Sequence, residues 1–509
     1  MIHTRLSTLL LFCLMAAPVL ASGVYNIRDY GAKGDGVSLE TAAIDKAIDA
    51  AAAAGGGTVF FPAGNYLSYT IHLKSNVSLY LDQGAVLIGA DGKEGAGYDA
   101  PEPNTAYDAY QDFGHNHWKN SLIWGEGLHD ISILGQGTIW GRGLIRNAGA
   151  KTPAGMGNKA IALKWCRNVT IQDVSILHGG HFGILATGVD NLSIRNLKID
   201  TDRDGMDIDC CKNVRVSDCF VNSPFDDGIC LKSSFGLGMA RATENVTVTN
   251  CQVSGYDLGT LLDGTFKRTY TKYSDGSPTG RIKMGTESNG GFKNVTISNC
   301  VFDYCRGLAL ETVDGAILED VTITNITMRD ITNAPIFIRL GERMRGPDTI
   351  PVGVCRRIIL SNIVVYNADP RHGCIISGDA GHPIEELHLS DIHLYYKGGG
   401  TKEMAARVVP GFEKDYPEPY RFGPMPAYGF FIRHVRDLHL HDIELGYATE
   451  DQRSPFYLED VAGAEFHHIQ AQKAAGVPCL VLNRVTDLSL EKVNGVKDET
   501  IPSTDHQAL

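Results

Sequence analysis

A short pattern that recurs along the chain constrains its fold more than any other feature. Each copy is a polar residue followed by alternating apolar positions, as in Asn168-Val169-Thr170-Ile171. Period-two alternation of Val, Ile and Thr is typical of short β-strands. Copies of the pattern begin at Asp130, Asn168, Asn191, Asn213, Asn245, Asn294, Asp320, Asp437 and Asp487.

The spacing between copies indicates a solenoid. The copies that begin at Asn168, Asn191 and Asn213 lie 23 and 22 residues apart, and the following gaps of 32 and 49 residues indicate the same unit with inserted loops. A unit of this size cannot bury its own apolar face, whereas stacked units can. Because the leucine-rich repeat frame is absent, we predict an all-β fold, a right-handed parallel β-helix that forms one domain over residues 22–509.

Such a solenoid needs covers at its ends, because its terminal strands expose unpaired edges. Residues 40–54 predict an N-terminal capping helix, since their apolar residues recur at helical spacing and three glycines follow. The segments 259–280 and 398–428 interrupt the repeat and are predicted to be long loops beside the solenoid.

The N-terminal residues resemble a secretory signal. Arg5 precedes a mostly apolar segment over 9–18, and the small residue Ala21 precedes a cleavage point. Residues 1–21 are therefore predicted to be a signal peptide, and the mature chain to be periplasmic or secreted. No later stretch has about 18 consecutive apolar residues, so no membrane span is expected.

Charge and cysteine usage exclude other classes of protein. The formal net charge of −13 argues against a nucleic-acid partner, because the backbone phosphates would be repelled. Eleven cysteines follow the signal, and none forms a CxxC pair, so a zinc site is unsupported. Most are expected to be buried core thiols, and only the adjacent Cys210 and Cys211 stay open to another role.

Counting along the repeat predicts which side chains are neighbours. Equivalent positions of successive coils lie about 4.8 Å apart. The thirteenth residue after the repeat asparagine is His181, Asp204 and Asp226 in three successive coils, and Asp227 follows directly. These side chains are therefore predicted to form a column on one face.

Clustered carboxylates suit one reaction class in particular. Glycoside hydrolysis needs a carboxylic acid and a carboxylate, about 6.5–9.5 Å apart where the carboxylate activates water. Mutual repulsion keeps one of two neighbouring carboxyl groups protonated. A calcium site and a solvated acidic patch are the alternatives, but the mostly apolar residues around Asp226 and Asp227 favour catalysis.

Several segments point to a known family. Residues 25–36, 61–66 and 135–139 are similar to fold signatures of pectin-acting β-helix proteins. Residues 202–207 resemble the motif Asn-Thr-Asp-Gly-x-Asp, and residues 225–228 resemble a paired-aspartate motif. With these motifs nearly the whole mature chain resembles glycoside hydrolase family 28, which contains the polygalacturonases and rhamnogalacturonan hydrolases. The resemblance implies an inverting hydrolase of pectic galacturonic-acid chains, with Asp226 as the general acid and Asp204 and Asp227 holding the attacking water.

Two departures from the family pattern concern substrate specificity. The family's polygalacturonases carry Gly-His-Gly in the next coil, whereas the matching segment 280–287 has no histidine. A later Arg-x-Lys that grips a galacturonate carboxylate is matched by 307–312, which has Ala309 and Glu311 instead. Arg281 and Lys283 form an Arg-x-Lys one coil earlier and are candidates to bind that carboxylate.

Three further residues are candidate substrate contacts. His181 is expected at a neighbouring subsite, Lys232 is expected to turn into the groove from the coil of the aspartate pair, and Glu311 is a candidate for sugar hydroxyls. The departures favour a rhamnogalacturonan-type chain or the non-reducing end of an oligosaccharide. The two insertions suit a groove closed at one end, as an exo-acting enzyme requires.

Two alternative functions stay open. A pectin or pectate lyase would hold Ca²⁺ with several aspartates, but Asp207 and Asp209 lie at other register offsets and need not face the same groove. A non-catalytic carbohydrate-binding β-helix would keep its binding without Asp226. The hydrolase interpretation expects no cofactor and no metal.

Overall fold

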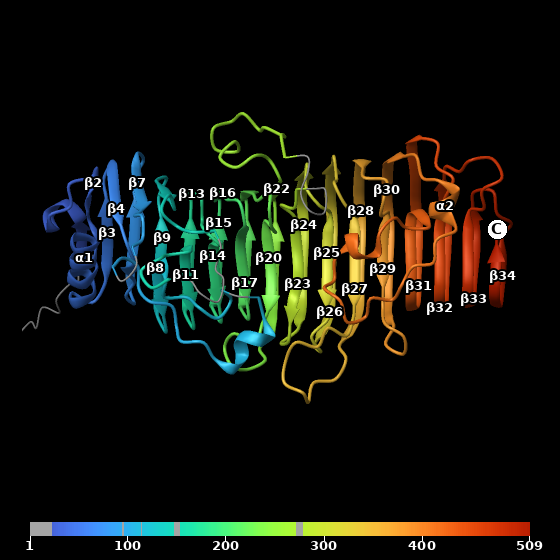
Figure 1. Cartoon of the computed structure of the whole chain (residues 1–509), viewed down its shortest axis with the longest axis horizontal. Coiled ribbons are helices and arrows are strands. Elements are labelled where there is room, and N and C mark those ends of the chain that lie inside the picture. Colours follow the sequence, from blue (N-terminus) through green and yellow to red (C-terminus); the bar gives the residue numbers. More distant parts are fainter. Residues whose placement is uncertain (1–22, 94–95, 113, 147–152, 271–277) are drawn as a thin grey trace, which may run out of the picture.

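The computed structural model describes residues 23–509 except 94–95, 113, 147–152 and 271–277. The predicted signal peptide therefore lies outside the described residues. Coils stack along one axis from the N-terminal to the C-terminal end (Figure 1). Strands of neighbouring coils pair in parallel from β1 to β33 within the described chain, so the predicted all-β parallel β-helix is confirmed.

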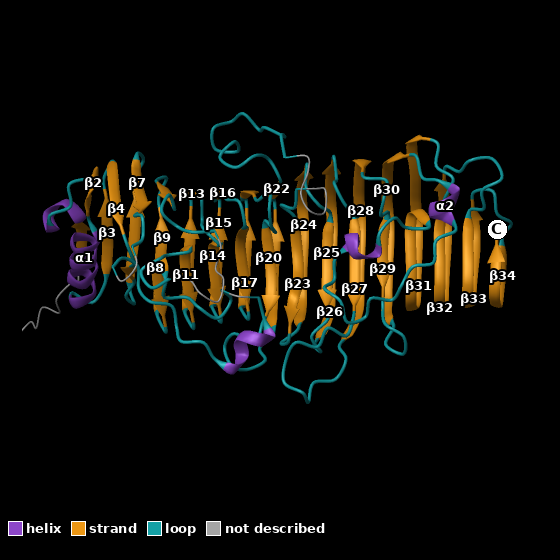
Figure 2. Cartoon of the chain, in the orientation of Figure 1, coloured by secondary structure: helices purple, strands orange, loops and turns teal. Residues whose placement is uncertain are grey.

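In the N-terminal half, most coils contribute one strand to each of three sheets, and strands make up most of the stack (Figure 2). The first sheet contains β5 (Ile71–His72), β8 (Ser121–Glu126), β11 (Lys159–Lys164), β14 (Phe182–Thr187), β17 (Asp204–Asp209), β20 (Ile229–Ser233), β23 (Ile282–Ser288), β25 (Leu308–Thr312), β27 (Ile336–Leu340) and β29 (Cys374–Ser377). The second contains β1 (Gly23–Asn26), β3 (Gly57–Phe61), β6 (Val77–Leu81), β9 (His129–Leu134), β12 (Arg167–Gln172), β15 (Asp190–Arg195), β18 (Lys212–Ser217) and β21 (Thr243–Thr249). The third contains β2 (Asp35–Leu39), β4 (Gly64–Ser68), β7 (Ala85–Gly89), β10 (Thr138–Trp140), β13 (Ser175–Leu177), β16 (Lys198–Asp200), β19 (Phe220–Asn222) and β22 (Gln252–Ser254).

In the C-terminal half, long strands serve more than one sheet. For example, β24 pairs with both β21 and β22, and β31 pairs with both β29 and β30. These strands are β24 (Phe292–Asp303), β26 (Ile317–Arg329), β28 (Val354–Ala368), β30 (Ile384–Gly398), β31 (Ala427–Thr449), β32 (Ser454–Ala471) and β33 (Leu480–Val493).

The polar residue of the repeat explains why the coils stay in register. Asn168, Asn191 and Asn213 have φ values of 55°, 53° and 57°, in the left-handed region that asparagine tolerates. Each side-chain amide donates to the side chain of the preceding coil, as from Asn191 to Asn168 at 2.9 Å and from Asn213 to Asn191 at 3.1 Å. The ladder continues through Asn245 and Asn294 at 3.0 and 2.8 Å.

Apolar residues of the same repeat form columns inside the coil. Val169, Leu192 and Val214 are paired in register and are at most 2% exposed. The eleven cysteines of the described residues are unpaired and buried, including Cys210 and Cys211. The prediction of core thiols is therefore confirmed for these residues.

Both ends of the solenoid are covered. Helix α1 (Thr41–Ala53) packs on the first coil through the predicted face of Ile44, Ala47, Ile48 and Ala51, none of which is exposed. At the other end, β34 (Glu499–Ala508) pairs antiparallel with β33, which ends the parallel stacking. No helix among the described residues has the length and apolar character needed to cross a membrane.

In the described residues, both insertions lie between strands. The first joins β22 to β23. The second joins β30 to β31 and contains the short helices α2 (Lys402–Ala405) and α3 (Pro419–Phe422). Gly398 and Tyr428, the predicted limits of the second insertion, belong to the flanking strands. This second insertion, residues 399–426, runs in front of the strands of the first sheet (Figure 1).

The asparagine ladder predicts a graded response at Asn213. Asn213→Gly keeps access to the left-handed conformation but loses the hydrogen bonds to Asn191 and Asn245. Asn213→Ala loses the same bonds, and its Cβ is also sterically strained in the left-handed conformation. We expect both variants to be less stable than the wild type, and the alanine variant to be the weaker by about 1–2 kcal/mol. Urea unfolding of the full chain measures the difference, and an alanine variant as stable as the glycine variant would contradict it.

Candidate active site

Three aspartates converge where strands of the first sheet begin. Asp204 is the first residue of β17, and Asp226 and Asp227 lie in the turn before β20. One carboxylate oxygen of each lies within 4.8 Å of the other two. The backbone N–H of Asp227 donates to the Asp204 carboxylate at 3.3 Å. The predicted set of carboxylates is thus brought together.

The register within this cluster differs from the predicted column by one residue. The Cα partner of Asp204 in the preceding coil is Phe182, so His181 lies one position earlier than expected. In the next coil Met206 pairs with Ile229, which places Asp227 opposite Asp204. The fixed count of thirteen fails because the turns before the first sheet differ by one residue between coils.

The three aspartates differ in exposure. Asp204 and Asp227 are each 3% exposed, whereas the Asp226 side chain is 27% exposed. Asp226 is therefore the member of the cluster that a large ligand can touch. The other two are nearly buried.

Arg203 holds the exposed aspartate. Its guanidinium donates to the Asp226 carboxylate, and a second nitrogen lies 3.4 Å from Nδ1 of His181. Burial raises the pKa of Asp226, but the Arg203 charge, together with those of Lys232 and Lys283, leaves that pKa below its ordinary value. The pKa of Asp204 is raised well above its ordinary value, first by burial and then by its acidic neighbours Asp207 and Asp226. Burial and the acidic neighbours therefore favour the protonated form of Asp204 over that of the other two aspartates.

Arg281 and Lys283, the predicted carboxylate-binding pair, hold carboxylates of the chain itself. Nε of Arg281 donates to Asp227 at 2.8 Å, and Nζ of Lys283 lies 3.4 Å from the same carboxylate. Arg281 also donates to Glu418, and Nζ of Lys283 is 3.5 Å from Glu311. Burial raises the pKa of Asp227, but these two cations outweigh it and lower the pKa.

Glu311 lies below the surface. It is fully buried, and burial raises its pKa to about 7 despite the Lys283 ammonium. Neither of its oxygens has a hydrogen-bond partner among the described residues. Its position differs from the exposed contact to sugar hydroxyls that the sequence suggested, because β25 places it opposite Arg339 under the second insertion.

A second cluster of charges adjoins the aspartates. Lys232, which is 5% exposed, lies 3.0 Å from Glu287 and 3.8 Å from Asp207. Nε2 of His115 is 2.9 Å from the Asp207 carboxylate, and one ligating atom each of His115, Asp204 and Asp207 lies within 4.8 Å of the others. Asp207 is fully buried, and its carboxylate lies close to Asp204, so its different register offset does not separate it from the aspartates.

His181 lies at the edge of the site. It is 5% exposed, and its Nδ1 lies 2.7 Å from the backbone oxygen of Arg146. Burial, reinforced by the Arg203 charge, holds the pKa of His181 well below its ordinary value, so the ring is neutral.

Sequence reasoning missed several of these residues. Arg203 and Asp207 stand inside the motif 202–207, so the motif itself carried the signal. His115 and Glu418 come from loops far away in sequence, 92 residues from Asp207 and 137 residues from Arg281. No repeat or motif links these loops to the first sheet, so no sequence signal could have found them.

The second insertion forms a wall of the site. Arg339 and Arg433, both from the first sheet, donate to the backbone oxygen of Gly411 at 3.0 and 3.4 Å. Phe422 packs into a buried apolar cluster with Phe337 and Phe431. Residues 399–426 are thus fastened over the strands that follow the aspartates.

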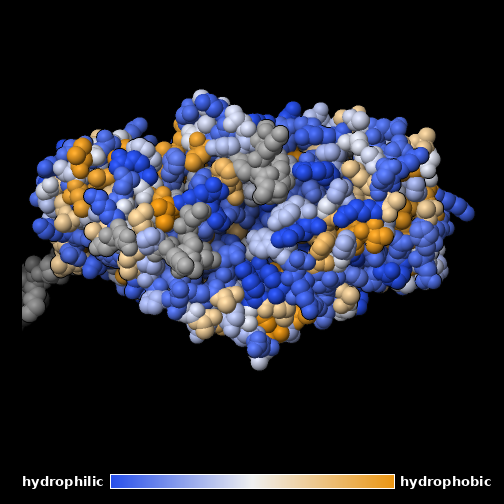
Figure 3. All heavy atoms as spheres, in the orientation of Figure 1, coloured by the Kyte–Doolittle hydropathy of each residue, from blue (hydrophilic) through white to orange (hydrophobic). Residues whose placement is uncertain are grey.

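The loop between β7 and β8 forms a further wall. Arg345, from the loop after β27, is 2.8 Å from Asp112 and 2.8 Å from Glu287. This contact joins two loops from coils on either side of the aspartates. The face seen in Figure 3 is mostly hydrophilic over these central coils.

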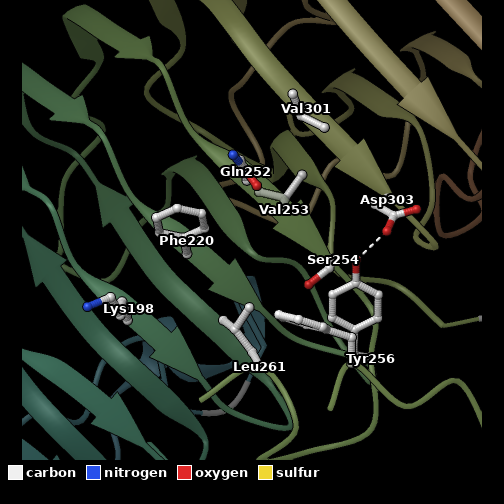
Figure 4. Close-up of a pocket in the computed structure, with 10 residues that line it drawn as sticks. Lys198, Phe220, Gln252, Val253, Ser254, Tyr256, Leu261, Val301 and Asp303 are labelled. Carbon is white, nitrogen blue, oxygen red and sulfur yellow. Dashed lines mark hydrogen bonds between the residues drawn. The ribbon is translucent and has the colours of Figure 1, made fainter. Parts of the chain in front are cut away.

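The first insertion is fastened by a buried carboxylate. Asp200 accepts hydrogen bonds from the backbone N–H groups of Gly259, Leu261 and Leu262 at 2.9–3.1 Å. The insertion covers a depression of about 350 Å³ on the outer face of the third sheet (Figure 4). Its lining residues are Lys198, Phe220, Gln252, Val253, Ser254, Tyr256, Leu261, Phe266, Val301 and Asp303. None of the three aspartates of the cluster lines this depression, so it is separate from the candidate active site.

The raised pKa of Asp204 predicts a stability effect with a defined sign. A carboxyl group whose pKa is higher in the folded state destabilises that state as the pH rises above its unfolded value of 3.8. We expect Asp204→Asn to raise the thermal midpoint at pH 7, and the gain to vanish as the pH falls towards 4. The control is Asp200→Asn, which should destabilise because that carboxylate is fully hydrogen-bonded. Equal destabilisation by both substitutions at pH 7 would contradict the raised pKa of Asp204.

Comparisons with known proteins agree with the motifs. A family model described as rhamnogalacturonase A/epimerase, pectate lyase-like, matches residues 24–256. A probable polygalacturonase from Vitis vinifera is 26% identical over 314 residues, which are 57% of this chain and 61% of that protein. An exo-poly-alpha-D-galacturonosidase from Dickeya chrysanthemi is 39% identical over 137 residues, 26% of this chain and 22% of that protein. The chain thus spans less than two thirds of the length of these relatives.

Solved structures show the same fold. A family 28 exopolygalacturonase from Yersinia enterocolitica is 18% identical with a TM-score of 0.62, over 93% of this chain and 79% of that one. A hyperthermoactive exopolygalacturonase from Thermotoga maritima is 17% identical with a TM-score of 0.53, over 95% of both chains. The family model and the sequence relatives thus agree with the motifs: the chain is similar in sequence to polygalacturonases, and it shares the fold of these solved structures.

Proposed function

We propose that this chain is an exported glycoside hydrolase that cleaves galacturonic-acid-containing pectic chains by inverting acid/base hydrolysis. The observation that carries the proposal is the cluster of Asp204, Asp226 and Asp227, in which one exposed carboxylate lies above two buried ones. This arrangement separates a group that touches a sugar from groups that hold water. The sequence relatives named polygalacturonase and exo-poly-alpha-D-galacturonosidase support the substrate class.

The roles follow from exposure and charge. Asp226, in its protonated form, donates its proton to the glycosidic oxygen as the bond to the anomeric carbon breaks. Water held by Asp204 and Asp227 attacks that carbon and gives its proton to the ionised carboxylate of the pair. Asp227 suits this base role because Arg281 and Lys283 keep it ionised.

Asp226 must gain a proton before it acts as an acid. Without substrate, Arg203 favours its ionised form. The guanidinium of Arg203 is accessible, with a side chain that is 26% exposed, and so is Arg146, which lies over the Phe225 ring. A uronate carboxylate that binds Arg203 competes with Asp226 for this cation. The competition raises the pKa of Asp226, so that its carboxyl group can hold the proton that a general acid needs. Substrate binding would thereby switch the acid on.

The carboxylates lie closer together than expected for an inverting hydrolase. Their closest oxygens lie within 4.8 Å of one another, less than the separation of about 6.5–9.5 Å common in inverting enzymes. The inverting course is therefore proposed on the resemblance to the family and not on this distance. Proton NMR of the first product anomer tests it directly: an α-linked substrate that yields the β-anomer first supports inversion.

Closure of the groove favours exo action. The second insertion is fastened over β27 and β31, and its Glu418 reaches Arg281 and Arg306 beside the aspartates. On this proposal the insertion blocks one end of the substrate-binding face, so that the end of a chain binds there and an uninterrupted chain does not. We therefore propose release of short products from the chain end.

A calcium-dependent lyase is the second candidate, because the aspartate cluster has the composition of a cation site. The contacts favour the hydrolase. The carboxylates of Asp226 and Asp227 are already neutralised by Arg203, Arg281 and Lys283, which leaves less negative charge for a divalent ion.

The proposal predicts the behaviour of Asp226→Asn. Wild type and variant are compared on polygalacturonate, its oligosaccharides and rhamnogalacturonan oligosaccharides, with product sizes resolved by chromatography. We expect mono- or disaccharide release on one of these substrates and a loss of about 100- to 10,000-fold in the variant. EDTA should leave the rate unchanged, and no product should absorb at 235 nm. Chelator-sensitive formation of a 235 nm product would establish the lyase instead, and full activity in Asp226→Asn would exclude this residue as the acid.

Arg203→Gln tests the proposed control of the acid. Without the guanidinium the pKa of Asp226 rises, so its protonated form persists to higher pH. We expect the basic limb of the kcat/KM profile to move to higher pH, and KM for a uronate substrate to increase because a carboxylate ligand is lost. Arg195→Gln, an exposed arginine on the second sheet, is the control and should change neither value. A pH profile identical to wild type in Arg203→Gln would refute the control of Asp226 by Arg203.

A further inference from the structure

A second constellation of chemically reactive side chains lies on the outer face of the second sheet, in the C-terminal half of the solenoid. Alternation along β31 buries Leu438 and Leu440 in the core and turns His439 and His441 outward. The parallel register sets Glu465 of β32 opposite His439. One atom each of His439, His441 and Glu465 lies within 4.8 Å of the others.

With a neutral His439, these groups have more hydrogen-bond acceptors than N–H donors. Nε2 of His439 lies 2.9 Å from the Asp437 carboxylate, and Nδ1 of the same ring lies 3.2 Å from Glu465. A neutral imidazole carries one N–H, so when Nε2–H donates to Asp437, Nδ1 presents a lone pair to a carboxylate. Nε2 of His441 is buried, has no hydrogen-bond partner among the described residues and lies 3.6 Å from the other Glu465 oxygen.

We propose that His439, His441 and Glu465 bind one transition-metal dication, represented by Zn²⁺. Two imidazole nitrogens and a carboxylate form the ligand type that zinc takes when water completes its coordination. Ligands about 2.1 Å from a tetrahedral ion are about 3.4 Å from one another. The separations of 3.2 and 3.6 Å run from the two histidines to different oxygens of Glu465, and both are close to this value.

Two neighbours support the site. Asp437 accepts from the ring nitrogen of His439 that faces away from the ion, which is the carboxylate–histidine arrangement that orients metal-bound imidazoles. His388 of β30 stacks on His439 with ring centroids 4.3 Å apart and fixes the plane of that ring. The ion would join β31 to β32 on a sheet that carries none of the proposed catalytic aspartates, so the inference does not depend on the proposed function.

The experiment titrates Zn²⁺ into the full mature chain, prepared without a polyhistidine tag and stripped of metal, by isothermal calorimetry. We expect one ion per chain and a rise in the thermal midpoint with Zn²⁺. His441→Gln should weaken binding at least tenfold, and Asp437→Asn by about 10- to 100-fold. His393→Gln is the matched control: His393 also faces a cross-strand glutamate, Glu444, at 3.0 Å, and should leave the affinity unchanged.

The contrary results are distinct. Absence of Zn²⁺ binding at micromolar concentration would show that these residues form imidazolium–carboxylate ion pairs only. Binding that survives His441→Gln would assign the ion to another place, such as the aspartate cluster. Either result overturns the proposal. Because both substituted histidines are partly exposed on a regular sheet, circular dichroism of each variant should match wild type.

Discussion

Parallel stacking in register is the constraint on which the rest of this structure depends. Each outward or inward position is repeated about 4.8 Å away in the next coil, so every side chain must tolerate its column neighbours. Apolar residues and asparagines can stack on identical residues in the next coil, whereas charged residues of one sign repel each other there. The outer face of the first sheet therefore alternates charges along its columns: Asp209 stands beside Lys232, and Glu311 beside Arg339. The site departs from this rule where Asp204 stands beside Asp227, and it needs Arg281 and Lys283 to hold that departure in place.

The electrostatics of the site follow from how these cations are shared. Arg281, Lys283 and Arg203 each contact a cluster carboxylate, but only Arg203 is accessible. Of the three aspartates, only Asp227 therefore has buried charge partners, whereas the partner of Asp226 is open to exchange. Asp204 has no cation within ion-pair distance among the described residues, and burial raises its pKa most. The cluster thus contains one aspartate with buried cation partners, one without a cation partner and one whose partner is accessible.

The sequence predicted the elements that depend on periodicity. The repeat predicted the coils, the helical stripe predicted α1, and the motifs predicted the aspartate cluster. Counting failed by one residue at His181, because a turn is free to gain or lose a residue without disturbing the sheets on either side of it. It also failed for His115, Asp112 and Glu418, because these residues reach the site through loops whose paths are set by tertiary contacts. Where Arg281 and Lys283 were expected to meet an external carboxylate, burial instead paired them with Asp227 and Glu418.

The asparagine ladder has a consequence for where this protein can be made. Asn168, Asn191, Asn245 and Asn294 each begin an Asn-x-Ser/Thr sequence, the acceptor for N-linked glycans. Nδ2 of these residues is the atom that a glycosyltransferase modifies and also the atom that bonds to the preceding coil. A sugar added before folding would occupy the space of the adjacent rung and separate the two coils. The architecture is therefore matched to a biosynthetic route that leaves these amides bare, and secretion through a glycosylating eukaryotic pathway would compete with its folding.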